Sequence, residues 1–101
     1  MIQKEKIVQA IYEAVDEVNL QQRENHQLSK TPETLLYGQG ALMDSLGLVT
    51  LVMETEQRIN DQFDCSVTLA NEKAFSQKNS PFRTVRSLAD YIATLLEEKE
   101  A

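Results

Sequence analysis

Ser45 is the residue of this sequence best placed to do chemistry, because it stands where a long amphipathic helix is expected to begin, in the run LMDSLG (residues 42–47). The first turn of a helix has backbone N–H groups without partners inside the helix, and the positive end of the helix dipole lies there. Both features stabilise an anion, so a phosphate ester on Ser45 would be favoured at this position. We therefore expect Ser45 to be an attachment point.

Other reactive side chains are few, which argues against catalysis by the chain itself. A serine hydrolase needs a general base, but the only histidine, His26, lies in a polar loop, and residues 42–47 lack the glycines of a nucleophile elbow. The single cysteine, Cys65, excludes an internal disulfide and, with one histidine, leaves too few ligands for a zinc site. We expect a solvated His26, a partly buried Cys65, no catalytic residue and no metal site.

Length and charge restrict the class of protein further. With 101 residues the chain fits one domain, spanning residues 1–101. A net charge of -6 argues against nucleic-acid binding, which needs clustered lysine and arginine, and suits basic protein partners. No stretch approaches membrane-spanning length, and the first residues lack the apolar run of a signal peptide. We therefore expect a cytoplasmic protein without membrane insertion.

Apolar residues that recur at helical spacing predict helices over residues 3–22 and 45–63, with a short helix over 70–77. A last helix is predicted from Thr84 onward, with Thr84 as its N-cap. The fold class is therefore all-α: a small bundle of three main helices plus one short helix. The inward faces are predicted to hold Ile7, Ile11, Ala14 or Val15 and Val18 in the first helix, Leu48, Val52, Thr55, Ile59 and Phe63 in the second, and Val85, Leu88, Ala89, Ile92 and Leu95 or Leu96 in the last.

The helix over 45–63 carries more apolar surface than one core face requires. Leu46, Val49 and Met53 fall on an arc away from the core stripe and near Ser45. Two interpretations remain open: the loop before Ser45 covers these residues, or they form a contact patch for a partner enzyme. In the second case the residues that the partner recognises are Asp44, Leu46, Val49, Met53, Glu54 and Glu56.

Several of these features occur together in one known family. They are Asp44-Ser45-Leu46, the following segment 49–54 (VTLVME), then Ile59, Phe63 and Val67, and a closing helix with Thr84, Val85, Leu88, Tyr91 and Ile92. This combination resembles the acyl carrier proteins, in the family's order of three main helices and a short third one, and covers roughly residues 3–97. The position of the tripeptide at the start of the second helix is the most specific part of the resemblance.

The resemblance implies that a phosphopantetheinyl transferase modifies Ser45, using coenzyme A as the donor of a covalent 4′-phosphopantetheine. The terminal thiol of this cofactor, not Cys65, then holds an acyl or aminoacyl group as a thioester. Asp44 matches the family's acidic residue before the serine, which can cap the helix and be read by the modifying enzyme, and Leu46 matches the apolar residue after it. Such a protein is a carrier and not an enzyme.

Gly47 and Thr50 stand where carriers of fatty acid synthesis commonly have acidic residues. The chain therefore looks more like the free-standing, specialised bacterial carriers of secondary-metabolite or cell-surface pathways. For such a protein we expect a monomer that meets an acyl- or aminoacyl-activating ligase or other acyl-transfer enzymes. The alternative from another class is an unmodified helical adaptor that uses Leu46, Val49 and Met53 as its binding face.

Overall fold

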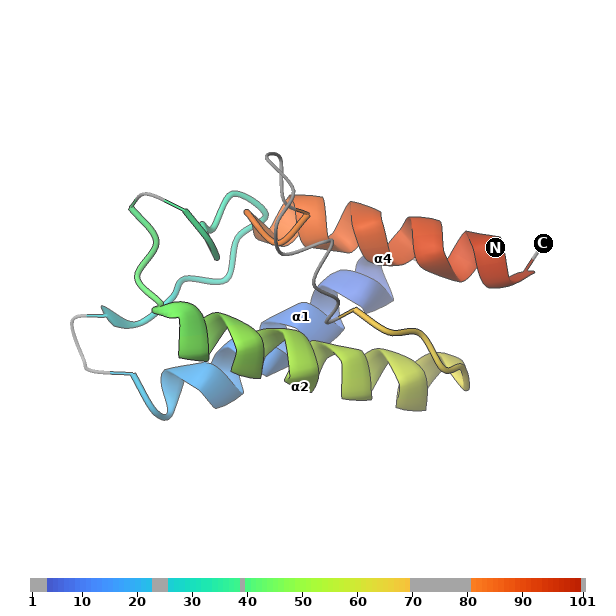
Figure 1. Cartoon of the computed structure of the whole chain (residues 1–101), viewed down its shortest axis with the longest axis horizontal. Coiled ribbons are helices and arrows are strands. Elements are labelled where there is room, and N and C mark those ends of the chain that lie inside the picture. The colour runs from blue at the N-terminus through green and yellow to red at the C-terminus, as the bar shows by residue number, and fades with distance from the viewer. Residues whose placement is uncertain (1–3, 23–25, 39, 70–80, 101) are drawn as a thin grey trace.

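The structure is a computed structural model that describes residues 4–22, 26–38, 40–69 and 81–100, except for the side chains of Ser45, Lys99 and Glu100. The described part contains three helices and no strand: α1 (Lys4–Asn19), α2 (Ser45–Phe63) and α4 (Val85–Glu100). This all-helical bundle confirms the predicted fold class (Figure 1). The short helix expected over residues 70–77 lies outside the described residues.

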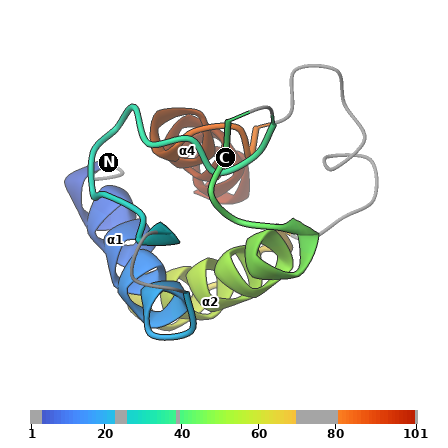
Figure 2. The same cartoon turned by 90° about the vertical axis from the view of Figure 1, so that its left-hand side faces the viewer.

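Helix α1 is the central element of the bundle, because it contacts both α2 and α4 (Figures 1 and 2). Its buried face contains the four positions predicted from the spacing and two more, namely Ile7, Ala10, Ile11, Ala14, Val15 and Val18. The helix ends at Asn19, three residues before the predicted end. Beyond it, the N–H of Gln21 bonds to the carbonyl of Val18, which is the tighter turn typical of a helix terminus.

Near the end of each of the first two helices, an asparagine side chain pairs with the backbone of a later residue. Asn19 donates to the carbonyl of Leu28 at 3.0 Å and accepts from its N–H at 2.8 Å. Asn60 pairs likewise with Val67, donating at 3.2 Å and accepting at 2.8 Å. Both Leu28 and Val67 are buried. Each amide therefore satisfies the backbone of an apolar residue that the following connection returns to the core.

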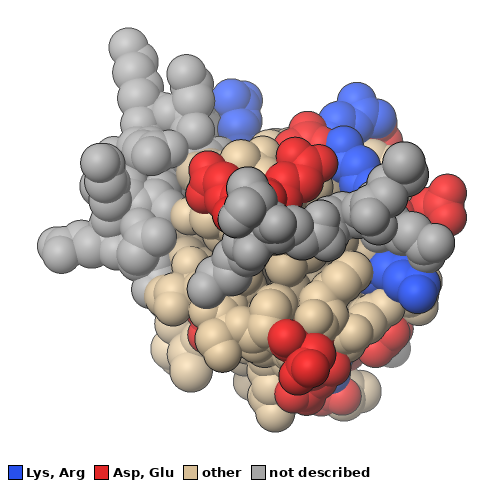
Figure 3. All heavy atoms as spheres, turned by 90° about the vertical axis from the view of Figure 1, so that its right-hand side faces the viewer, with Lys and Arg blue, Asp and Glu red and all other residues tan. Residues whose placement is uncertain are grey.

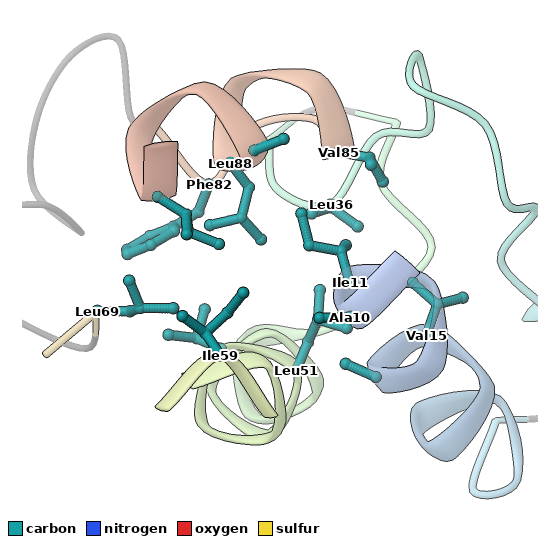
Figure 4. Packing of buried hydrophobic residues seen from close by; sticks show 14 of the residues in the cluster. Ala10, Ile11, Val15, Leu36, Leu51, Ile59, Leu69, Phe82, Val85 and Leu88 are labelled. Atoms are coloured by element: carbon teal, nitrogen blue, oxygen red, sulfur yellow. The ribbon is translucent and has the colours of Figure 1, made fainter. Parts of the chain in front are cut away.

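Side chains from the connections fill the space that the helices leave in the core. Leu36, Leu69 and Phe82 are fully buried. In Figure 4, Leu69 and Phe82 lie between α2, with its Ile59, and α4, with its Leu88. The connections are therefore part of the core, so the helices alone do not account for its packing.

The start of α4 is fixed by a reciprocal cap and by the loop before α2. The N–H of Ser87 bonds to Thr84 Oγ1 at 3.1 Å and the N–H of Thr84 to Ser87 Oγ at 3.0 Å, which confirms the predicted N-cap. An isolated antiparallel bridge joins Leu35 to Thr84, and the N–H of Leu36 bonds to the carbonyl of Arg83 at 2.7 Å. None of the described helices is both long and apolar enough to cross a membrane.

Candidate functional site

The site begins at the first turn of α2, where Asp44 caps the helix. Asp44 has extended backbone angles, and its Oδ1 accepts from the N–H of Gly47 at 2.8 Å. Ser45 is the first residue of α2. Its side chain lies outside the described part of the structure. Both neighbours of Ser45 are exposed, so an enzyme can approach this turn from solvent.

Gly47 permits close packing beneath this turn. A Cβ at position 47 would lie 3.3 Å from the Cβ of Met43 and 3.4 Å from Asp44 Oδ1, which is tighter than ordinary van der Waals contact. Met43 is buried, so it has little room to move away. The sequence suggested only that Gly47 lacks an acidic side chain. The structure shows that a small residue here lets Met43 and the capping carboxylate pack against the helix.

The apolar strip of α2, which we define as Leu46, Val49 and Met53, faces solvent. These side chains are 74%, 38% and 57% exposed, respectively, whereas the core stripe of the same helix is buried from Leu48 to Ile59. The loop before Ser45 therefore does not cover them, which decides against that interpretation within the described residues. Three apolar side chains in a row beside the helix start form a surface on which a partner can exclude water.

The two glutamates predicted to frame this strip lie on either side of it. At about 100° per residue, Glu54 and Glu56 are each displaced by roughly 80° from Leu46 around the helix axis. Both carboxylates have contacts within the chain: Glu54 pairs with Arg58, and Glu56 Oε1 accepts from the N–H of Leu69 at 2.6 Å. Their engagement limits how freely either can turn toward a partner.

Cys65 and His26, the other two residues considered above for chemistry, each take part in a hydrogen bond within the chain. Cys65 is half-buried, and its thiol donates to Asn60 Oδ1 at 3.4 Å. His26 is half-buried rather than fully solvated as expected, and its carbonyl accepts from Gln22 Nε2 at 3.2 Å. Within the part of the chain that the structure describes, no group of three or more histidine, cysteine, aspartate or glutamate residues could hold a metal ion.

One feature of the site, a hollow beside Asp44, was not predicted from the sequence. Residues from the end of α1 and from the loop come together there because the Asn19–Leu28 pairing turns the chain back toward α2. The hollow has a volume of about 320 Å³ and is lined by Gln21, Gln22, His26, Leu42 and Asp44. These residues come from two separate segments of the chain, around positions 21–26 and 42–44, and no sequence pattern predicts that the two segments meet.

Comparison with known protein families, with curated proteins and with solved structures finds no match for this chain. The case for its function therefore depends on its own residues.

Proposed function

We propose that this protein is a carrier that holds acyl or aminoacyl intermediates on a 4′-phosphopantetheine attached to Ser45. The observation that supports this best is the exposed apolar strip of α2, which runs directly from the capped helix turn that contains Ser45. Single exposed apolar side chains are common on protein surfaces, whereas three in a row on one helix form a contiguous patch, which is typical of an interaction surface. An attachment point and a partner surface on one helix are what a carrier needs.

The attachment step uses the serine hydroxyl and coenzyme A. The hydroxyl oxygen of Ser45 attacks the phosphate next to pantetheine, a phosphodiester bond forms, and 3′,5′-adenosine bisphosphate leaves, while the hydroxyl proton passes to a base of the transferase. The residues present suit such a group, because the first turn of a helix favours an anion and the flanking Asp44 and Leu46 are exposed to the enzyme. The cofactor, once attached, supplies the thiol for thioester chemistry.

The protein itself positions this arm and is recognised by its partners. We propose a phosphopantetheinyl transferase and an acyl- or aminoacyl-activating ligase, or another acyl-transfer enzyme, as partners that contact the apolar strip. The pathway proposed is a specialised biosynthesis, because Gly47 and Thr50 leave the exposed side of α2 less acidic than in carriers of fatty acid synthesis. We further propose that the protein acts as a monomer in the cytoplasm.

Intact mass measurement tests the proposal. The purified chain is incubated with coenzyme A and a broad-specificity phosphopantetheinyl transferase, and the gain of one phosphopantetheine is expected. Peptide mapping should place it on Ser45. Ser45→Ala is the control and should gain nothing, while circular dichroism should show that it keeps its helices. If the wild-type chain gains no mass under conditions that modify a known carrier, the protein is not a carrier and the adaptor interpretation stands.

A further inference from the structure

Two hollows that have Leu42 in common are lined by residues of the loop before α2. The first is the Asp44 hollow described above, and the second, of about 300 Å³, lies beside Leu35. Leu42 lines both, and His26 of the first is followed in the chain by Gln27 of the second. We name these two hollows together the track; Asp44, the neighbour of Ser45 in the chain, lines its first hollow. The Leu35 hollow is lined by Gln27, Leu28, Ser29, Glu33, Thr34, Leu35, Gly40 and Leu42.

The loop that forms this track is held in place by several hydrogen bonds. The Asn19–Leu28 pairing fixes one side. Gln27 Nε2 donates to the carbonyls of Asn19 at 2.8 Å and Gln22 at 3.2 Å, so the loop is tied to the end of α1 at more than one point. Thr34, which is buried, donates to the carbonyl of Ser29 at 3.0 Å. A track that is already formed requires little ordering when a ligand enters.

The chemistry of the track changes along its length. The Asp44 hollow presents two glutamine amides, an imidazole and a carboxylate. Amide side chains both donate and accept hydrogen bonds, and the carboxylate can accept from a second donor besides the N–H of Gly47. The Leu35 hollow is more apolar, because three leucines contribute to it, although Gln27, Glu33 and the hydroxyl groups of Ser29 and Thr34 also line it.

This order of groups suits the 4′-phosphopantetheine arm. From its phosphate outward the arm has a dimethyl carbon, a hydroxyl group and then two amides, and it ends in a thiol. The dimethyl carbon can pack on Leu42, and the hydroxyl and amide groups match the polar side chains of the Asp44 hollow. The thiol end, with a short carried group, suits the leucines of the Leu35 hollow.

We propose that the phosphopantetheine arm docks along this track, on the side of the molecule formed by the end of α1 and the loop before α2. The proposal rests on the proposed carrier function, since the arm must first be attached to Ser45. Docking keeps the thioester end against Leu28, Leu35 and Leu42 and away from water. A partner that binds the exposed apolar strip of α2 does not cover the track, so the arm can still move out of it.

A comparison of backbone amide NMR spectra tests where the arm lies. Spectra of the ¹⁵N-labelled chain are recorded before and after modification, both at equal pH and salt. Beyond the turn that contains Ser45, shift changes are expected at Gln21, Gln22, His26 and Leu42. Changes that instead extend along α4 overturn the docking track, as do changes confined to residues 44–48. Failure to gain the cofactor at all is a separate outcome, which overturns the carrier function itself.

The reactivity of the arm's thiol provides a second test. In a Cys65→Ser background the arm has the only thiol, and its alkylation by iodoacetamide is followed by mass. If the docked state is populated at least half of the time, Leu42→Ala should raise the alkylation rate by at least about twofold. Leu20→Ala is the matched control, because Leu20 is an exposed leucine at the same end of the molecule that does not line the track. Equal rates in both variants would contradict docking.

Discussion

At the scale of single residues, Thr55 is a polar side chain that lies within the core. Its side chain is fully buried on the core stripe of α2, and its hydroxyl has no hydrogen-bond partner among the described residues. The sequence placed Thr55 correctly on the inward face, because helical spacing fixes direction. Spacing does not show whether a hydroxyl finds an acceptor, since that depends on the packing of neighbouring elements.

Replacing Thr55 by valine should therefore stabilise the protein. Valine has nearly the same shape and lacks the hydroxyl, and a buried polar group without a partner costs about 1–3 kcal/mol. We expect Thr55→Val to raise the free energy of unfolding by about 1 kcal/mol in urea titrations. Thr50→Val is the control, because the Thr50 hydroxyl bonds to the carbonyl of Leu46 on the exposed side of α2. A loss of stability in Thr55→Val would indicate that the hydroxyl has a partner in solution.

At the scale of elements, the sequence predicted the helices better than it predicted the connections. The long stripe of α2, from Leu48 to Ile59, and the cap of α4 at Thr84 follow from local spacing and capping preferences, and the structure confirms both. The predicted end of α1 at Gln22 was wrong by three residues, because Asn19 uses its side chain to pair with Leu28. Such a pairing joins residues nine positions apart, and no local preference reveals it.

The two asparagine pairings should contribute measurably to stability. Asn19→Ala removes two hydrogen bonds to Leu28, and at about 0.5–1.5 kcal/mol for each bond we expect a loss of about 1–3 kcal/mol. Asn60→Ala should cost a similar amount through Val67. Urea denaturation measures both, and hydrogen exchange should be faster at the Leu28 amide in the first variant. Gln57→Ala, at an exposed position on α2, is expected to stay within about 0.5 kcal/mol of wild type. Asparagine variants as stable as this control would show that the pairings are incidental.

At the scale of the whole molecule, negative charge is widespread but does not gather on the apolar strip. The net charge is -6, and acidic groups are interspersed with basic ones at the end of the bundle where α2 finishes (Figure 3). Arg58 lies 3.8 Å from a carboxylate oxygen of Glu13 and 3.9 Å from one of Glu17, and it also pairs with Glu54. Composition predicts the sign of the net surface charge. It does not predict that Glu54 is engaged at the contact between α1 and α2.

Partner recognition should therefore depend more on apolar contact than on charge. Apolar contacts mainly slow dissociation, whereas charged surfaces mainly speed association and are screened by salt. The rate of phosphopantetheine transfer to Ser45 should fall by less than about threefold between low and high salt, where electrostatically steered association changes by about 10-fold or more. Met53→Glu should reduce kcat/KM by about tenfold, because it places a charge in a contact that excludes water.

Two variants make the comparison specific. Glu54→Ala should reduce kcat/KM by less than about threefold, since Arg58 retains Glu13 and Glu17 as partners when Glu54 is removed. Gln62→Glu adds the same charge as Met53→Glu at an exposed position near the far end of α2, and it should leave the rate unchanged. Urea midpoints of all three variants check that they are folded. A steep salt dependence, together with a larger defect in Glu54→Ala than in Met53→Glu, would show that the acidic residues govern recognition, because only charge contacts are screened in this way.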